Sequence, residues 1–409
     1  MSIVPGNNFL MGPFTQMVTL NELPLKGPIS DGDLQIITNG GVMVKDGIIE
    51  KVGHFDDLKA FYGHLPVDEI EDPAVLLPSM VDCHTHICFE GSRAQDYNLK
   101  LQGVSYVDIA KQGGGIWRTV QFTRDAGESS LVRGIIERVD KHLEKGITTI
   151  EVKSGYGLSG PHEIKMLRAI RQAAAKTRAT LVPTFLGAHT LPRDFDGSSK
   201  DYLEYLKAMV LPLVAKEKLS NRIDIFIEET AFGVEEAFEY LNAGKDLGFE
   251  ITVHADQFTT GGSEVAIKLG ALSADHLEAS GEKEIEMLAK SHTIAVVLPG
   301  ASLGLGIGFA PARQLLDAGC AVAIASDWNP GSAPMGDLLL QAAILGIYEK
   351  LSAAETFAGI TFRAAAALGL RDRGRIVPGY KAHLMAFPTN DYREILYHQG
   401  AIKPFKVWC

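Results

Sequence analysis

The sequence predicts an α/β fold, a (β/α)8 TIM barrel joined to a small β-sandwich domain that both ends of the chain build together. The length of 409 residues suits a barrel of about 250 residues plus a smaller unit. Eight apolar runs between residues 74 and 327 alternate with helical stretches, which is the pattern of β/α units. Before and after this region, short apolar runs separated by Gly, Asn, Asp and Pro are typical of strands joined by turns.

The predicted strands and helices follow one another in a regular order. Short runs at 34–37, 42–44 and 48–52 predict the first strands of the small domain. Each barrel strand is expected where an apolar run ends in a polar residue. These runs are 74–86, 147–154, 179–189, 222–229, 250–256, 271–277, 293–299 and 321–327. The helices between them are expected at 129–144, 161–176, 201–216, 234–247, 281–290 and 311–318.

The end of the chain predicts a hairpin. The segment RDRGRIVPGYKAHLMAF, which follows Leu370, places Gly374 and Gly379 at turns between alternating apolar residues. Because a hairpin of this size does not fold alone, we expect it to pair with the N-terminal strands. The predicted domains are therefore 1–73 with 371–409 for the composite small domain and 74–370 for the barrel.

Two features that suggest other folds are weak. The sequence Gly304-Leu305-Gly306-Ile307-Gly308 has glycines spaced as in a dinucleotide-binding turn, but it follows the seventh run instead of an early strand. Residues 293–312 carry no charge over the length of a membrane span, yet prolines and glycines interrupt them. We expect a buried strand and a glycine-rich loop there.

The composition limits the classes of function. Lys plus Arg number 39 against 50 for Asp plus Glu, a net charge of −11, which argues against nucleic-acid and membrane partners and favours a small molecule. The four cysteines form no C-x-x-C pair, so neither a disulfide framework nor a zinc finger is indicated. The first residues lack the pattern of a signal peptide, and we expect a cytoplasmic protein.

A candidate metal site lies at the ends of the predicted strands. His84 and His86 stand two residues apart at the end of the first run, and such residues of a strand share a face. Because the carboxyl ends of barrel strands meet on one face, His254 and Asp327 are the natural further ligands. Three imidazoles and one carboxylate suit Zn²⁺ or Fe²⁺ and do not suit Ca²⁺.

Six motifs carry a resemblance to a known family. They are VDCHTHICFEGSR (81–93), VKSGYG (152–157), FLGAHTLP (185–192), HADQF (254–258), SADHLE (273–278) and ASDWNPGS (325–332). In this order, over nearly the whole chain, they resemble the amidohydrolase superfamily and, within it, the imidazolonepropionase family. The resemblance implies that a metal-activated water hydrolyses 4-imidazolone-5-propanoate to N-formimino-L-glutamate, in a homodimer with one divalent metal ion, zinc or iron, per subunit.

The resemblance also implies a role for each site residue. The metal ligands are His84, His86, His254 and Asp327, and the substrate-binding residues are Arg93, Tyr106, Tyr156, His189, Asn329, Gly331 and Ser332. The chemistry of these side chains agrees with these roles. Arg93 offers a planar fork for the anionic propionate, Tyr156 can donate a phenolic hydrogen bond, and His189 can bond a ring nitrogen or carbonyl.

Two positions depart from the pattern of the resemblance. Gln257 stands where some relatives have Glu, and because an amide cannot accept a proton from water, Gln257 can bind substrate but cannot be the general base. We therefore assign the catalytic proton transfers to His276 and Asp327. His383 stands where the C-terminal hairpin of the superfamily usually has Asp, and we attach no catalytic meaning to it.

Lys153 is a possible metal ligand, because binuclear relatives bridge two metals with a carboxylated lysine of a barrel strand. Lys153 ends the second run, whereas the fourth run ends in Glu228 and Glu229. We therefore predict a single metal ion and an electrostatic or supporting role for Lys153.

Two other functions remain open. One is deamination of a nucleobase or triazine ring at the same kind of site, a reaction that would not need Arg93 and Tyr156 to recognise a carboxylate. The other is a scaffold protein that has kept the fold and lost catalysis. The presence of all four ligand-type residues argues against the scaffold.

Overall fold

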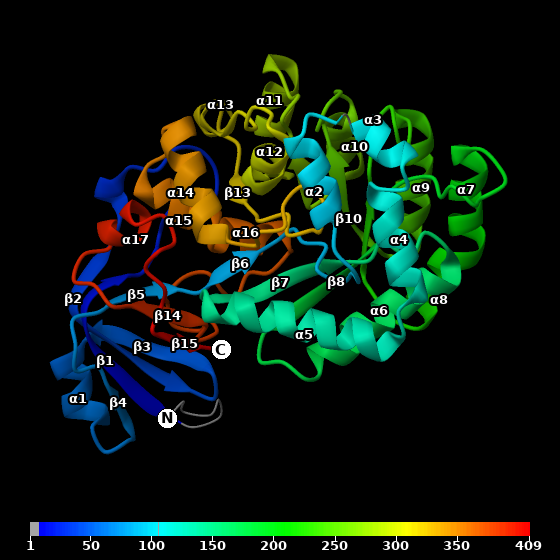
Figure 1. Ribbon diagram of the computed structural model, residues 1–409. Coiled ribbons are helices and arrows are strands. Elements are labelled where there is room, and N and C mark those ends of the chain that lie inside the picture. The colour runs from blue at the N-terminus through cyan, green and yellow to red at the C-terminus, as the bar shows by residue number, and fades with distance from the viewer. Residues whose placement is uncertain (1–7, 105) are drawn as a thin grey trace.

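The computed structural model describes residues 8–104 and 106–409 and contains the predicted barrel (Figure 1). Eight strands form one parallel sheet in sequence order, from β6 to β13. The sheet nearly closes, because His86 N donates to Trp328 O at 2.9 Å and Asp327 N donates to His84 O at 3.1 Å across the last gap. The strands are β6 (Met80–Asp82), β7 (Ile147–Lys153), β8 (Thr180–Ala188), β9 (Arg222–Ile225), β10 (Glu250–Ala255), β11 (Ser273–His276), β12 (Ile294–Val297) and β13 (Val322–Ile324).

Both ends of the chain build the second sheet, as predicted. Its order is β15-β14-β5-β1-β2-β3, with β4 beside β1. The C-terminal β14 runs antiparallel to β5 and pairs Leu384 with Pro78. The expected hairpin is absent, because residues 371–383 form no strand and the other partner of β14 is β15. Residues 75–78, which we expected in the first barrel strand, belong to this sheet, and the barrel begins at Met80. The strands are β1 (Phe9–Val18), β2 (Ile36–Lys45), β3 (Ile48–His54), β4 (Val67–Glu69), β5 (Val75–Pro78), β14 (Leu384–Phe387) and β15 (Lys406–Trp408).

Helices surround the barrel strands (Figure 1). The predicted helices are present as α5, α6, the pair α7 and α8, α9, α11 and α13. Those at 55–62, 94–125, 262–269, 299–305, 338–367 and 393–397 were not predicted, and the one at 299–305 replaces part of the expected glycine-rich loop. None of the helices in the described part of the chain is long and apolar enough to cross a membrane. The helices are α1 (Phe55–Tyr62), α2 (Ala94–Leu101), α3 (Tyr106–Lys111), α4 (Ile116–Asp125), α5 (Glu128–Glu144), α6 (Gly160–Ala174), α7 (Ser199–Tyr205), α8 (Leu211–Lys216), α9 (Val234–Asp246), α10 (Gly262–Leu269), α11 (Glu282–Ala289), α12 (Pro299–Leu305), α13 (Ala312–Asp317), α14 (Leu338–Glu349), α15 (Ala353–Gly359), α16 (Phe362–Ala367) and α17 (Arg393–Tyr397).

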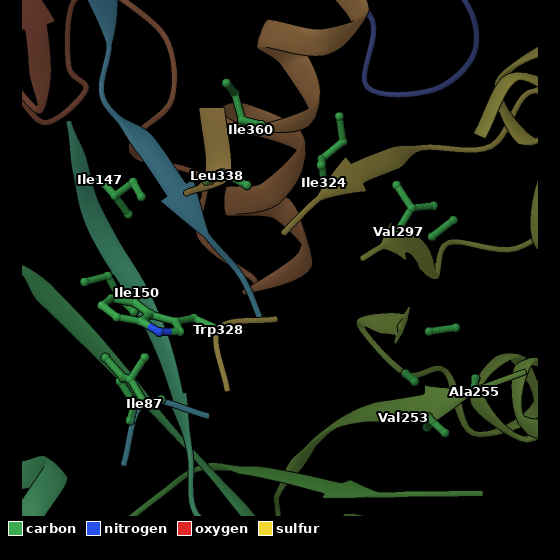
Figure 2. Close-up of a cluster of buried hydrophobic side chains, with 14 of the residues drawn as sticks. Ile87, Ile147, Ile150, Val253, Ala255, Val297, Ile324, Trp328, Leu338 and Ile360 are labelled. Carbon is green, nitrogen blue, oxygen red and sulfur yellow. The ribbon is translucent and has the colours of Figure 1, made fainter. Parts of the chain in front are cut away.

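The barrel strands bury both faces. Side chains that point outward, such as Val253 and Ala255 of β10 and Ile324 of β13, join the buried hydrophobic core (Figure 2). The inward side chains divide into two groups, which we call the polar half and the apolar half of the interior. The polar half comprises Thr149, Glu151, Lys153, Thr184, Arg222, Asp224, Thr252, His254, Ser273 and Asp275 on β7 to β11. The apolar half comprises Val81 and Cys83, at and after β6, Val296 on β12 and Ala323 on β13, packed against α16.

Candidate active site

The four predicted metal ligands converge at the carboxyl end of the barrel. Asp327 Oδ1 lies 3.5 Å from His84 Nε2 and 3.5 Å from His86 Nε2. The Nε2 atoms of His254 and His86 are 3.2 Å apart. All four side chains are buried, although they come from β10 and from the segments that follow β6 and β13. Potential ligand atoms from three separate segments of the chain thus face one small volume.

The state of these side chains fits a bound cation. Burial lowers the pKa of His84 and His86 well below the ordinary value and lowers that of His254 to about 3, so all three imidazoles are neutral and can offer a lone pair. His84 Nε2 is buried and has no hydrogen-bond partner among the described residues. Clusters of at least three ligand atoms within 4.8 Å of one another recur here, and one of them joins His84 and His254 to His276. Neutral imidazoles beside one carboxylate form a donor set for a divalent transition metal.

Two buried carboxylates that we did not predict lie beside two of these histidines. His84 Nδ1 lies 2.7 Å from Asp275 Oδ2, and His254 Nδ1 lies 2.9 Å from Asp224 Oδ2. A carboxylate beside Nδ1 keeps the proton on that nitrogen and leaves Nε2 free to bind a metal. Both aspartates point into the barrel from β9 and β11, where the alternation of their strands places them.

His276 ends β11 beside the metal-ligand candidates. Its ring centroid lies 5.4 Å from that of His254, and its Nδ1 lies 3.4 Å from Glu278 Oε2. Burial alone would lower the pKa of His276, but the carboxylates of Glu278, Asp327 and Asp275 raise it above the ordinary value. The backbone is left-handed at both His276 (φ 90°) and Leu277 (φ 72°), an uncommon pair for side-chain-bearing residues that is typical of functional sites.

The predicted substrate residues after β13 form one tight turn. Asn329 Nδ2 donates to Asp327 Oδ2 at 2.9 Å, and Asn329 Oδ1 accepts from the backbone N–H groups of Gly331 at 2.7 Å and Ser332 at 2.8 Å. Arg93 lies against this turn, because a Cβ on Gly331 would come within 2.5 Å of its Nη1 atom. A side chain at 331 would therefore displace the guanidinium from this position.

The guanidinium of Arg93 is held from its other side. Arg93 Nε donates to Asp96 Oδ2 at 2.9 Å, and the same carboxylate oxygen accepts the backbone N–H of Gly115 at 2.8 Å. With Nε engaged, the terminal nitrogens remain for an anionic ligand. Asp96 was not predicted, and its position three residues after Arg93 is the only signal that the sequence offers.

Tyr156 and His189 lie together near the histidine cluster. The ring of His189 stacks on that of His86 with centroids 5.0 Å apart, and the Tyr156 ring lies 5.5 Å from that of His189. His189 Nδ1 lies 3.0 Å from Gly155 O, so it carries the proton and Nε2 faces the cluster. Buried Glu163 accepts the backbone N–H groups of Gly155, Gly157 and Leu158 at 2.7–2.9 Å and thereby fixes the loop that carries Tyr156.

Two further predicted substrate residues are Gln257 and Tyr106. Gln257 is half-buried on the loop that follows β10. Glu228 holds this loop by accepting the backbone N–H groups of Phe258 at 3.0 Å and Thr259 at 3.1 Å. Tyr106 begins α3, and its side chain lies outside the described part of the structure.

Comparison with known proteins agrees with this geometry. A family model described as the amidohydrolase family matches residues 121–396. An imidazolonepropionase from Bacillus cytotoxicus is 40% identical over 378 residues, which are 92% of this chain and 89% of the relative. One from Bacillus mycoides is 39% identical over the same shares. The chain belongs to the imidazolonepropionase family of amidohydrolases.

A solved structure shares the fold of this imidazolonepropionase family member. An adenosine deaminase from Xanthomonas campestris with bound zinc superposes with a TM-score of 0.71 at 18% identity, covering 99% of this chain and 92% of the deaminase. At this identity the likeness concerns the fold alone. Membership of the amidohydrolases, together with the buried histidine clusters, assigns the site to a divalent metal ion.

Proposed function

We propose that this chain hydrolyses 4-imidazolone-5-propanoate to N-formimino-L-glutamate, with one divalent metal ion held by His84, His86, His254 and Asp327. The observation that carries the proposal is the 40% identity with a curated imidazolonepropionase over 92% of the chain. The buried donor set of three imidazoles and one carboxylate supports it. The product retains every atom of the substrate plus one water, since water adds at the ring carbonyl and the carbon–nitrogen bond of the ring breaks.

The side chains around the histidine cluster divide the work of this reaction. A divalent metal ion, when bound, polarises the carbonyl and lowers the pKa of a water to near neutrality. His276 takes a proton from the attacking water and returns it to the ring nitrogen that leaves, because its raised pKa suits both steps. Glu278, 3.4 Å from Nδ1, balances the charge of the protonated ring.

The substrate is recognised through its propionate. The terminal nitrogens of Arg93 bind the carboxylate in a bidentate manner, while Asp96 keeps the guanidinium in place. Tyr156, His189 and Gln257 orient the imidazolone ring, and the turn formed by Asn329, Gly331 and Ser332 holds Asp327 beside it.

The metal and the assembly complete the proposal. The metal is zinc or iron, since the donor set suits either and occupancy follows availability. In line with the family resemblance, the enzyme is a cytoplasmic homodimer that acts on a small molecule and has no nucleic-acid partner.

The proposal is tested by following the imidazolone absorbance after the purified protein is added to freshly generated 4-imidazolone-5-propanoate, with and without a chelator. Elemental analysis for zinc and iron accompanies the assay. We expect rapid loss of absorbance that the chelator abolishes, with N-formimino-L-glutamate as product. Loss at the spontaneous rate by protein that holds one metal ion per chain would refute the substrate and redirect the assay to aminoheterocycles.

An Arg93→Ala variant makes the assay specific for the propionate. We expect chiefly a rise in KM of roughly 30-fold or more, because removing a charge-assisted partner costs about 2 kcal/mol or more. An unchanged KM would refute the role of Arg93.

A further inference from the structure

A fully buried ammonium lies beneath the histidine cluster. Lys153, at the end of β7, has its Nζ atom 2.7 Å from Asp224 Oδ2, 2.9 Å from Glu151 Oε2 and 3.8 Å from Asp275 Oδ2. All four side chains have no solvent exposure. Three carboxylates around one ammonium require that Lys153 is charged, because unpaired buried carboxylates would be strongly unfavourable.

Two of the three carboxylate oxygens around Lys153 also contact the histidines. Asp224 Oδ2 faces both Lys153 Nζ and His254 Nδ1, at 2.7 and 2.9 Å. Asp275 Oδ2 faces both Lys153 Nζ and His84 Nδ1, at 3.8 and 2.7 Å. One ammonium on β7 is thereby connected to an imidazole on β10 and to another that follows β6.

Asp224 and Asp275 accept few hydrogen bonds besides their contacts with Lys153 and the histidines. Asp224 Oδ1 accepts the backbone N–H groups of Ile225 at 2.7 Å and His254 at 3.2 Å, but its Oδ2 is shared by Lys153 and the His254 ring. Asp275 Oδ2 accepts a hydrogen bond from Thr252 Oγ1 at 3.1 Å, and its Oδ1 is without a hydrogen-bond partner in the described residues. Lys153 is therefore the group common to both contacts.

Arg222 is a second buried cation of the polar half and serves as a control for Lys153. Arg222 is likewise buried, with 1% exposure, and lies 4.0 Å from Glu151, 3.7 Å from Glu250 and 3.3 Å from Ala367 O. Within the described structure, its ion pairs include neither Asp224 nor Asp275. The two cations thus share Glu151 and burial and differ in their connection to the histidines.

We propose that Lys153 is a positioning residue for the metal site, which holds Asp224 and Asp275 so that His254 and His84 both present Nε2 to one divalent cation. This inference rests on the ligand set of the proposed function. It assigns to Lys153 an effect on metal affinity that acts through the two aspartates. Lys153 itself does not touch the metal or the substrate.

A simple charge effect predicts the opposite result, which makes the proposal testable. Removing a positive charge near a cation site would strengthen cation binding if Lys153 acted only by repulsion. If Lys153 positions the ligands, its removal frees both aspartates and weakens binding. The loss of a group that orients metal ligands typically lowers affinity 10–100-fold.

The experiment compares metal-free Lys153→Met and Arg222→Met proteins in Zn²⁺ titrations against a chromogenic chelator. We expect the Zn²⁺ dissociation constant to rise 10–100-fold in Lys153→Met and to stay within about twofold of wild type in Arg222→Met. The visible spectrum of the Co²⁺-loaded proteins should change only in Lys153→Met. Neither readout requires substrate, so the inference about Lys153 can fail while the proposed reaction stands, and the reverse. A wild-type protein that binds no Zn²⁺ would refute both.

Other results would overturn the proposal. If the Zn²⁺ affinity of Lys153→Met equals or exceeds that of wild type, Lys153 only neutralises the buried carboxylates. If Arg222→Met loses as much Zn²⁺ affinity as Lys153→Met, the effect is a general one of breaking buried ion pairs. If Lys153→Met does not fold, Lys153→Gln, which keeps a donor, replaces it with the same expected loss. If neither folds while Arg222→Met does, Lys153 serves the fold and the proposal is wrong.

Discussion

The two halves of the barrel interior are built from opposite kinds of side chain. The polar half, on β7 to β11, contains three carboxylates, a lysine, an arginine and four hydroxyl side chains besides His254, all buried. The apolar half, at β6, β12 and β13, consists of Val81, Cys83, Val296 and Ala323, which pack against alanines of α16. Both halves lie beneath the same metal-ligand candidates.

The two halves of the interior contribute differently to the orientation of the metal-ligand histidines. His84 follows the apolar β6, but its Nδ1 contact crosses the barrel to Asp275 of the polar half. His86 follows the same strand and has its Nδ1 atom without a hydrogen-bond partner within the described residues. The polar half thus orients the histidines, whereas the apolar half supplies packing, and substitutions in the two halves should fail in different ways.

The largest effect is expected at His276, at the end of polar β11. His276→Ala should lower kcat by a factor of roughly 10²–10⁴, since it removes the group that transfers protons, while the melting temperature and bound metal remain those of wild type. Asp327→Asn should also abolish turnover. Steady-state kinetics with metal analysis on the same preparation provide the measurement. If His276→Ala loses its metal together with its activity, His276 is a ligand, as its cluster with His84 and His254 would allow.

The sequence predicts local parts of this site and misses the parts that depend on register. The pair His84 and His86 is visible because its spacing is a local motif, although both residues follow the end of β6. Asp224 was missed because the apolar run continues to Glu228, so the strand was expected to end there. The strand β9 in fact ends at Ile225, which places Asp224 near its carboxyl end. Glu228 instead holds the loop that carries Gln257. Whether Asp224 meets His254 depends on how β9 and β10 pair, which no single segment encodes.

The barrel itself was predictable because β/α alternation recurs along the chain, but the start of its first strand was not. The apolar run 74–86 is continuous, yet β5 and β6 separate at Ser79, whose N–H donates to His383 O at 2.9 Å in the terminal sheet. An apolar run does not indicate which of two sheets will pair with it.

Deleting the hydroxyl of Thr184 in the polar half should reduce the stability of the fold. Thr184→Val removes the hydrogen bond that Thr184 Oγ1 donates to Glu151 Oε1 at 2.5 Å and leaves a buried carboxylate with one partner fewer. We expect the free energy of unfolding in urea to fall by about 1.5–3 kcal/mol, although the replacement is more hydrophobic. A rise in stability would mean that the polar half tolerates apolar packing and that its hydrogen bonds are dispensable.

The reverse exchange in the apolar half should destabilise the fold by a smaller amount. Val296 is fully buried on β12 and packs in the apolar cluster of the interior. Val296→Thr keeps the shape but places a hydroxyl in this apolar cluster, for a loss of about 1–2 kcal/mol. Urea unfolding measures the loss. Val296 pairs with Asp275 across β11 and β12, but the exchange removes no group that contacts a ligand, so Zn²⁺ affinity should stay near that of wild type. Weakened metal binding would show that the two halves are not separate in function.

The smallest effect at neutral pH is expected outside the barrel, where His383 contacts the polar strand β7 from the terminal sheet. Its ring lies 3.2 Å from Thr148 Oγ1, and burial lowers its pKa to about 4. Because the unfolded chain binds a proton near pH 6.5 and the folded chain only near pH 4, His383 reduces stability as the pH falls through this window. His383→Asn should match wild type at pH 7.5 and lose less stability than wild type between pH 6.5 and 4, in urea unfolding at each pH. The buried histidines of the metal site titrate equally in both proteins, so the difference between the two curves isolates His383. Parallel curves would show that this ring takes up its proton at the same pH in the folded and the unfolded chain. The contact with Thr148 would then persist with the hydroxyl as acceptor.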